Sequence, residues 1–300
     1  MTPRHPLVRL LPPWGRDVDE ALQREAVADL LGVAVDELDA IRMGPRYHYR
    51  PLAGTKPDGR ERRILAPSPA LKKLQRRFLD AYLVDQEVHP AAMAFRPGGS
   101  TLAHALPHAR SRLIAAVDLR DFFESTRGGR VARWLAAQGW DREATRILMR
   151  LCVFRDALPQ GAPTSPGLSN LVNRRLDERL DGLARRTGGV YTRYGDDLAF
   201  SWPDERLPGG FTASVEDVLA RSGYEVQPRK GWRVGAARDG FEIVGLVLAG
   251  DGRVRVPRAL RWRAALLRWR AALVGDPATT RRARGLAGYL KMVDRAPRTR

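Results

Sequence analysis

Hydrophobic residues in the middle of the chain follow strand patterns. Residues 113–123, LIAAVDLRDFF, form a nearly continuous apolar run that ends in acids, which is typical of a strand buried on both faces. Apolar and polar residues alternate through residues 191–202, and this pattern predicts a hairpin that turns at Gly195-Asp196. Further strands are predicted for residues 47–53 and 60–67, paired around the turn sequence KPDG, and for residues 241–248.

Helical spacing of apolar residues accounts for most of the remaining chain. In residues 68–84 the apolar stripe consists of Leu71, Leu74, Phe78 and Tyr82, which we expect to face a core. Another face of this helix is basic, and it is either solvated or in contact with a phosphate backbone; its residues are Lys72, Lys73, Arg76 and Arg77. Other helices are predicted for residues 19–33, 35–41, 128–140, 141–153, 165–187, 212–223, 257–274 and 281–295.

The helix predicted for residues 257–274 carries a second apolar stripe with several arginines beside it. The stripe has the spacing i, i+4, i+7, i+11 and consists of Trp262, Leu266, Trp269 and Leu273. We expect these side chains in the core, with the stacking of nucleic-acid bases on the tryptophans as the alternative.

The net charge of the chain predicts a protein that binds an anionic partner. The 300 residues carry a formal charge of +18, and the residues after 252 contain fourteen basic side chains against two acidic ones. This concentration of positive charge toward the C-terminal end of the sequence favours nucleic acid as the partner. The single cysteine, Cys152, is expected to be a buried thiol, and the lack of a signal-peptide core near the N-terminus predicts a cytoplasmic protein without a membrane span.

Three aspartates at predicted strand ends carry the candidate chemistry. Asp196 and Asp197 lie side by side in the second hairpin, and Asp118 ends the continuous apolar strand. An isolated Asp-Asp pair is usually a turn feature, but carboxylates that converge from neighbouring strands need cations between them. Two Mg²⁺ ions about 4 Å apart would meet that need and would stabilise both oxygens of an in-line phosphoryl transfer.

Between these acids lies the constrained segment ALPQGAPTSPGLSNL, residues 157–171, which leads into a helix N-terminus. At this point the chain resembles reverse transcriptases, and among them the compact bacterial enzymes of the retron type. The resemblance extends in order over about 230 residues through YRPLAGTKPDGRERRILAPSPALKKLQRRFL, AFRPGGSTLAHALPHA, VDLRDFFEST, LPQGAPTSPGLSN, YGDDLAFS, VQPRKG and FEIVGLVL. The chain departs from the usual retron pattern at His104–His108, at Ile243-Val244-Gly245 and at Gly195.

The resemblance implies roles for individual residues. Asp118, Asp196 and Asp197 would be catalytic and hold two Mg²⁺ ions, with the Leu119 carbonyl completing one shell, and Lys230 would lie near the leaving pyrophosphate. Residues implied in nucleotide binding are Lys56, Arg63, Asp121, Phe122, Phe123, Gln160 and Gly161. Phe123 in particular would lie under the sugar of the incoming nucleotide. RNA is expected on Lys72, Lys73, Arg76 and Arg77 and on Arg261, Arg268 and Arg270.

The fold implied is an α+β right-hand polymerase with an antiparallel palm sheet. Its predicted divisions are a helical extension (1–46), fingers (47–115), a palm (116–256, with a helical fingers insertion at about 127–158) and a basic helical thumb (257–300). The implied function is RNA-directed DNA synthesis from dNTPs on a structured non-coding RNA, giving a DNA–RNA hybrid in a retron or related anti-phage system. Two alternatives are a template-independent or protein-primed DNA polymerase of the same fold, and a non-catalytic RNA-binding module.

Overall fold

A computed structural model describes residues 20–38, 49–55 and 61–297 of the chain. Its helices are α1 (Glu20–Leu31), α3 (Pro69–Ala81), α4 (Thr101–Ala105), α5 (Phe122–Ser125), α6 (Gly128–Ala137), α7 (Arg142–Cys152), α8 (Thr164–Val172), α9 (Arg174–Arg186), α10 (Phe211–Arg221), α11 (Arg258–Val274) and α12 (Pro277–Asp294). Its strands are β1 (Tyr49–Thr55), β2 (Glu61–Pro67), β3 (Leu113–Asp118), β4 (Val190–Tyr194), β5 (Asp197–Trp202), β6 (Arg233–Gly235), β7 (Glu242–Ile243), β8 (Leu246–Leu248) and β9 (Val254–Arg255).

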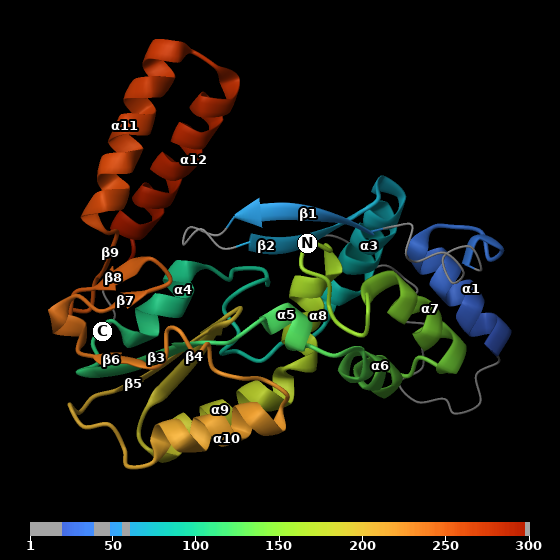
Figure 1. Ribbon diagram of the computed structural model, residues 1–300, viewed down its shortest axis with the longest axis horizontal. Coiled ribbons are helices and arrows are strands. Elements are labelled where there is room, and N and C mark those ends of the chain that lie inside the picture. The colour runs from blue at the N-terminus through green and yellow to red at the C-terminus, as the bar shows by residue number, and fades with distance from the viewer. Residues whose placement is uncertain (1–19, 39–48, 56–60, 298–300) are drawn as a thin grey trace.

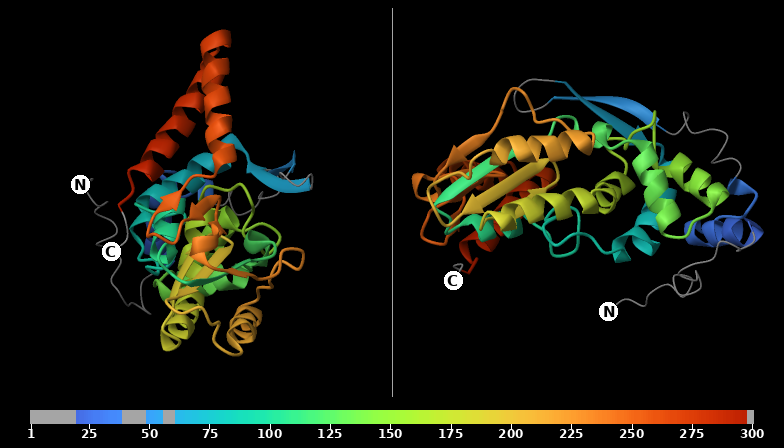
Figure 2. Two further views of the ribbon diagram at one scale, coloured as in Figure 1. Left: turned by 90° about the vertical axis from the view of Figure 1, so that its left-hand side faces the viewer. Right: turned by 90° about the horizontal axis from the view of Figure 1, so that it is seen from below.

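A four-stranded antiparallel sheet of order β4-β5-β3-β6 forms the centre of the molecule. Every residue of β3 is buried, and β4 and β5 form a hairpin that turns at Gly195 and Asp196, so both sequence predictions are confirmed. Helices α9 and α10 lie side by side across one face of the sheet (Figures 1 and 2). The predicted α+β class with antiparallel strands is confirmed.

A separate core lies beside this sheet, where α1, α3, α6, α7 and α8 pack together beneath the β1–β2 hairpin (Figure 1). Leu71 and Phe78 of the predicted stripe on α3 are buried there, and Tyr82 follows the helix and stacks on Phe78 with ring centroids 5.6 Å apart. Cys152, at the end of α7, is buried as expected. The predicted helix at 35–41 falls partly outside the described residues.

A third group of elements covers the other end of the sheet. The small sheet β7-β8-β9 packs with α4 and with the last turn of α12 around Ile243, Leu246 and Val293. From this base α11 and α12 project as a two-helix hairpin (Figures 1 and 2). Among the described residues, no helix is both long and apolar enough to span a bilayer.

Three sequence predictions about these elements are wrong. Residues 241–248 form two short strands, because Val244 and Gly245 both have positive φ and make a tight turn between them. The helix predicted for 165–187 is interrupted at Asn173, whose side chain accepts from Arg130 and donates to Tyr224.

The third wrong prediction is the buried stripe on α11. Trp262 is 76% exposed and Trp269 62% exposed, and Leu266 and Leu273 are exposed with them. A two-helix hairpin buries only the face that each helix turns toward the other, which for α11 includes Ala264. Since no third element covers α11 within the described residues, its second apolar face stays at the surface.

Candidate active site

The sheet register brings the predicted acidic residues together. Asp118, the last residue of β3, is the direct partner of Asp197, the first residue of β5. The Leu119 amide donates to the Asp196 carbonyl over 2.8 Å, and the Gln227 amide donates to the Asp118 carbonyl over 2.8 Å. The main chain at the end of β3 is therefore fixed from both sides, with two carboxylates facing each other across the strand pair.

The environment of these carboxylates differs from residue to residue. Asp118 is 6% exposed, Asp197 is half-buried and Asp196 is exposed in the turn. Burial, followed by the hydrogen bond and charge of Asp118 and the charge of Asp196, raises the pKa of Asp197 to about 8. Lys230 Nζ donates to Asp118 Oδ1 over 2.6 Å. An ammonium group already neutralises part of the charge that the carboxylates concentrate here.

The pair fits a divalent cation by its chemistry. Two carboxylates this close cannot both remain charged, so a proton or a cation must lie between them, and oxygen ligands of this type suit Mg²⁺. In the described part of the chain, no three His, Cys, Asp or Glu side chains are already gathered into a metal cluster. The arrangement is thus a converging pair, Asp118 and Asp197, with Asp196 one residue away.

Three predicted nucleotide-binding residues follow directly after β3. Asp121 has φ of +43° and precedes the short helix α5. Phe122 is buried, stacked on Tyr224 with ring centroids 5.6 Å apart. Phe123 is only half-buried and packs edge-on against Phe122 at 5.3 Å. The two phenylalanines therefore differ, with Phe122 in the core and Phe123 between the core and the surface.

The segment that contains Gln160 and Gly161 is tied to the β1–β2 hairpin. The Leu65 amide of β2 donates to the Gln160 carbonyl over 2.7 Å. Gly161 has φ of +124°, and a Cβ added there would lie 2.7 Å from the Leu65 carbonyl oxygen, so only glycine fits this close approach. A cavity of about 590 Å³ opens beside this contact, with Leu52, Leu65 and Gln160 among its lining residues.

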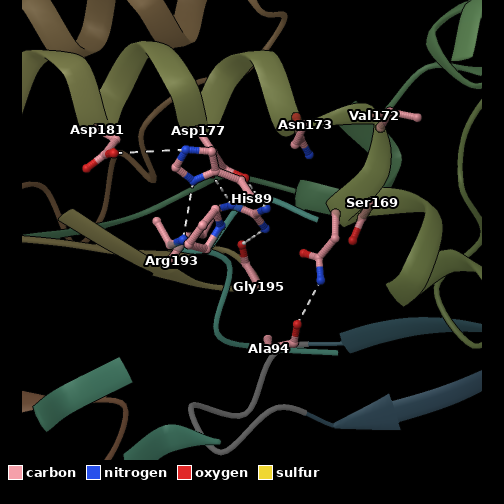
Figure 3. Close-up of polar contacts among 12 residues, drawn as sticks. His89, Ala94, Ser169, Val172, Asn173, Asp177, Asp181, Arg193 and Gly195 are labelled. Atoms are coloured by element: carbon pink, nitrogen blue, oxygen red, sulfur yellow. Dashed lines mark hydrogen bonds and ion pairs between the residues drawn. The ribbon is translucent and has the colours of Figure 1, made fainter. Parts of the chain in front are cut away.

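A fully buried ion pair supports the turn that carries Asp196. Arg193 and Asp177 are both inaccessible to solvent, and the guanidinium Nε and Nη2 donate to the two carboxylate oxygens over 2.8 and 2.7 Å. Arg193 Nη1 also donates to the Gly195 carbonyl over 3.2 Å. Figure 3 shows Asp177 descending from α9 onto Arg193, with Gly195 beyond it. The ion pair thereby joins α9 to the β4–β5 hairpin.

Comparison with known families shows the family to which the chain belongs. The family model described as "Reverse transcriptase (RNA-dependent DNA polymerase)" matches residues 55–247. The chain belongs to the reverse transcriptase family. The match contains β3, the segment around Gln160 and the β4–β5 hairpin, so the converging carboxylates lie inside the region that defines the family.

Curated relatives place the chain near the retron reverse transcriptases. It is 34% identical to the retron Mx162 reverse transcriptase of Myxococcus xanthus over 91% of this chain and 64% of that protein. It is 37% identical to the retron Mx65 reverse transcriptase of the same organism over 73% of this chain and 55% of that protein. The retron Ec86 reverse transcriptase of Escherichia coli is 28% identical over 83% of this chain and 77% of that protein. The chain thus spans less than two thirds of the two Myxococcus relatives.

Among solved structures, the foamy viral protease–reverse transcriptase in complex with double-stranded DNA is similar with a TM-score of 0.42 and 17% identity. The likeness covers 73% of this chain and 32% of that one. The family match, together with the antiparallel central sheet, confirms the predicted right-hand polymerase fold class.

The remaining residues that the sequence predicts to bind nucleotide or RNA lie on several separate elements. Lys56 lies outside the described residues; Arg63 is placed on β2 opposite Ala53 by its main chain alone. Lys72, Lys73 and Arg76 are exposed on α3, and Arg268 and Arg270 are exposed on α11. Two of the arginines predicted to contact RNA bind groups within the protein. Arg77 donates to the carbonyls of Leu31 and Gly32 at the end of α1, both over 2.6 Å, and Arg261 pairs with Asp294.

Sequence reasoning missed the Asp177–Arg193 pair, although the pattern contains a signal for it. Arg193 is two residues from Tyr191 on a strand, so both side chains share the core face. Asp177 lies in the apolar stripe of α9 with Leu180 and Ala184 at helical spacing. A basic and an acidic side chain that each face the core indicate a buried ion pair, because burial of either charge without its partner would be strongly unfavourable.

Proposed function

We propose that this protein is an RNA-directed DNA polymerase that adds dNTPs to a primer on an RNA template. The observation that carries the proposal is the in-register pair of Asp118 and Asp197, set in a chain of the reverse transcriptase family. The retron relatives support a narrower proposal, in which the template is a structured non-coding RNA and the DNA product serves in defence against phage.

The catalytic parts are proposed as follows. Asp118, Asp196 and Asp197 hold two Mg²⁺ ions, with the Leu119 carbonyl as a further ligand; when bound, the ions stabilise the attacking and leaving oxygens of the transfer. Lys230 moves from Asp118 toward the leaving pyrophosphate, which its half-exposed, flexible side chain allows.

The nucleotide is proposed to lie between α5 and the segment around Gln160. Phe123 packs against its sugar, which its partly exposed ring permits, while the main chain of Asp121 and Phe122 faces the phosphates. Arg63 and Lys56, on and beside the β1–β2 hairpin, complete the triphosphate site. Gln160 and Gly161 border the sugar and the template, next to the cavity under the hairpin.

The duplex of template and primer is proposed to contact α11 and the basic face of α3. On α11 the exposed stripe around Trp262 and Trp269 runs between arginines at neighbouring helical positions, including Arg268 and Arg270. Apolar contact along a groove, combined with cations that reach phosphates on either side, suits a nucleic-acid duplex. The residue limits predicted for extension, fingers, palm and thumb belong to the same proposal.

Substitution of Asp196 tests the activity. Asp196→Asn nearly preserves the side chain's shape but removes a charged metal ligand, so primer extension in Mg²⁺ is expected to fall by at least about 10³-fold. RNA affinity, measured by fluorescence anisotropy, should remain within about twofold, because the basic surfaces lie elsewhere.

The matched control is Asp204→Asn, an exposed aspartate in the loop after β5, which should leave extension unchanged. Substantial extension by Asp196→Asn would contradict the proposal. Nucleotide incorporation by the unaltered protein without any RNA would point instead to a template-independent polymerase, and RNA binding with no incorporation under any condition would point to a non-catalytic module.

A further inference from the structure

Phe95 has a main-chain conformation that aromatic residues rarely adopt, and its side chain is left at the surface. Its φ is +59°, in the left-handed region, and the side chain is 44% exposed. Neither feature helps the fold, because the conformation is strained and the ring is only partly removed from water. Strain that the surrounding structure maintains is a frequent property of functional sites.

The main chain before Phe95 is held to the palm by hydrogen bonds. The Ala94 carbonyl accepts from the buried side chain of Asn170 over 2.7 Å, the dashed contact at Ala94 in Figure 3. The Met93 amide donates to the Arg193 carbonyl over 2.7 Å, and the Arg193 amide donates to the Ala91 carbonyl over 2.8 Å. The main chain that leads into Phe95 is therefore held in place by α8 and β4.

The ring lies between the proposed nucleotide site and the catalytic turn. Its centroid is 6.2 Å from that of Phe123 and 6.4 Å from that of Tyr194. A Cβ added to Gly195 would be 3.4 Å from two carbons of the Phe95 ring. Gly195 is buried while the next residue, Asp196, is exposed, and the Phe95 ring lies within van der Waals range of the side of Gly195 from which a Cβ would project.

We propose that Phe95 contacts the primer's 3′-terminal nucleotide and positions its hydroxyl for attack. This inference rests on the proposed polymerase function. The nucleotide that carries the attacking hydroxyl must lie next to both the incoming nucleotide and the aspartates, and the Phe95 ring lies near both Phe123 and Gly195. An exposed aromatic face offers the sugar and base an apolar surface that accepts any of the four bases.

The decisive variant is Phe95→Gly, because glycine adopts the observed φ without strain. If the ring serves the substrate, the variant should melt at the same temperature as the unaltered protein or higher. Its kcat/KM for extension of a matched DNA primer on RNA should fall about tenfold or more, because a displaced terminus is poorly aligned for attack. Extension of a mismatched terminus should fall less, so that discrimination against mismatches weakens.

A binding measurement separates this inference from the polymerase proposal. A primer with 2-aminopurine at its 3′ end should change fluorescence on binding to the unaltered protein, and Phe95→Gly should reduce that change at least twofold. Val190→Ala is the control, since Val190 is 43% exposed and lies at the far end of β4; it should alter neither readout.

Each outcome has a definite meaning. A lower melting temperature for Phe95→Gly with unchanged kinetics and fluorescence would overturn the inference and make the ring a packing residue. An inactive unaltered protein that still shows the Phe95-dependent fluorescence change would overturn the polymerase proposal but leave the primer contact standing. An inactive unaltered protein with no such fluorescence change would overturn both.

Discussion

At the scale of single residues, Arg193 shows how the central sheet supports the turn that carries Asp196. Its guanidinium binds Asp177 with two hydrogen bonds, donates to the Gly195 carbonyl and lies 5.7 Å from the ring centroid of Phe122. Tyr191 OH donates to Asp177 Oδ1 over 2.8 Å, so the carboxylate is further satisfied. One buried side chain thereby supports both the turn before Asp196 and the helix after Asp118.

We expect Arg193→Met to destabilise the protein by about 3–5 kcal/mol, because it leaves the Asp177 carboxylate buried without its cation. Urea unfolding measures this change. Arg174→Met is the control, since the ion pairs of Arg174 with Glu87 and Glu178 are exposed, and its removal should cost about 1 kcal/mol or less. Equal effects of the two substitutions would show that the buried pair adds nothing.

Phe123 is expected to select the sugar of the incoming nucleotide. A ring packed against C2′ leaves no room for a hydroxyl and no partner for its hydrogen bond. Phe123→Val should therefore raise the use of GTP relative to dGTP, on the order of tenfold or more, as the ratio of kcat/KM on one RNA template. If Phe123 were only a core residue, the melting temperature would fall and this ratio would not change.

At the scale of elements, a chain of polar groups lies buried between α4 and the β4–β5 hairpin. His108 Nδ1 contacts Ser201 Oγ and its Nε2 contacts Thr192 Oγ1, each over 2.7 Å. Thr192 Oγ1 in turn lies 2.7 Å from His104 Nδ1. Burial lowers the pKa of His108 to about 3, and burial with the charges of His108 and Arg193 lowers that of His104. At neutral pH we therefore expect both imidazoles to be uncharged in the folded protein.

This network predicts a decline of stability in acid. The pKa of His108 is depressed from 6.5 to about 3 by folding, so the unfolded chain binds the extra proton between these values. Stability from His108 is complete above pH 6.5 and falls by about 1.4 kcal/mol per pH unit below it. The free energy of unfolding can be measured with urea at pH 7.5, 6 and 5. Below pH 6.5 it should fall less steeply with decreasing pH in His108→Gln than in the unaltered protein, by about 1.4 kcal/mol per pH unit. Identical slopes in the two proteins would show that His108 is not held neutral by folding.

The spacing of apolar residues along the sequence predicted most of these helices and strands, because in each of them the apolar face packs against another element of the fold. The buried strand β3, the β4–β5 hairpin and the stripe of α3 all follow from spacing alone. Spacing could not show that α11 has nothing packed on its outer face within the described residues, nor that Val244 adopts positive φ and divides the last predicted strand. The aspartates were predictable from their positions at strand ends, whereas Phe95 depends on a tertiary contact with Asn170 through Ala94.

At the scale of the whole molecule, positive charge and exposed apolar surface coincide on the projecting helices. The residues after 252 hold fourteen of the 52 basic side chains, and the exposed stripe of α11 lies among them. Figures 1 and 2 show this hairpin standing away from the rest of the protein, anchored at one end by the β7–β9 sheet. The two features together are expected to serve a nucleic acid.

RNA binding should therefore depend on salt through the arginines of α11. Replacing Arg268 and Arg270 with Gln should reduce the slope of log Kd against log salt by about 0.7–0.9 for each phosphate that is no longer neutralised. Trp262→Ala with Trp269→Ala should weaken binding by about 25 cal/mol for each Å² of apolar surface that the groove no longer covers, without changing that slope, because no cation is removed. Anisotropy titrations from about 50 to about 300 mM salt measure both quantities.

Arg281 and Arg282, which are exposed on α12, supply the matched control for charge alone. Their replacement with Gln should leave the slope nearly unchanged if the nucleic acid lies along α11. An equal reduction would mean that the hairpin attracts RNA only through its total charge.

The buried pair of Asp177 and Arg193 also restricts how this sequence can drift over generations. A lineage in which either partner is replaced first must pass through a protein with a lone charge inside its palm, and selection removes proteins that fall below the stability threshold. The two positions are therefore expected to change together, although they lie sixteen positions apart in the sequence. Joint replacement by Leu and Met is expected to restore a foldable chain, but the hydrogen bond from Arg193 to the Gly195 carbonyl would be lost, so the turn that carries Asp196 would be held less firmly.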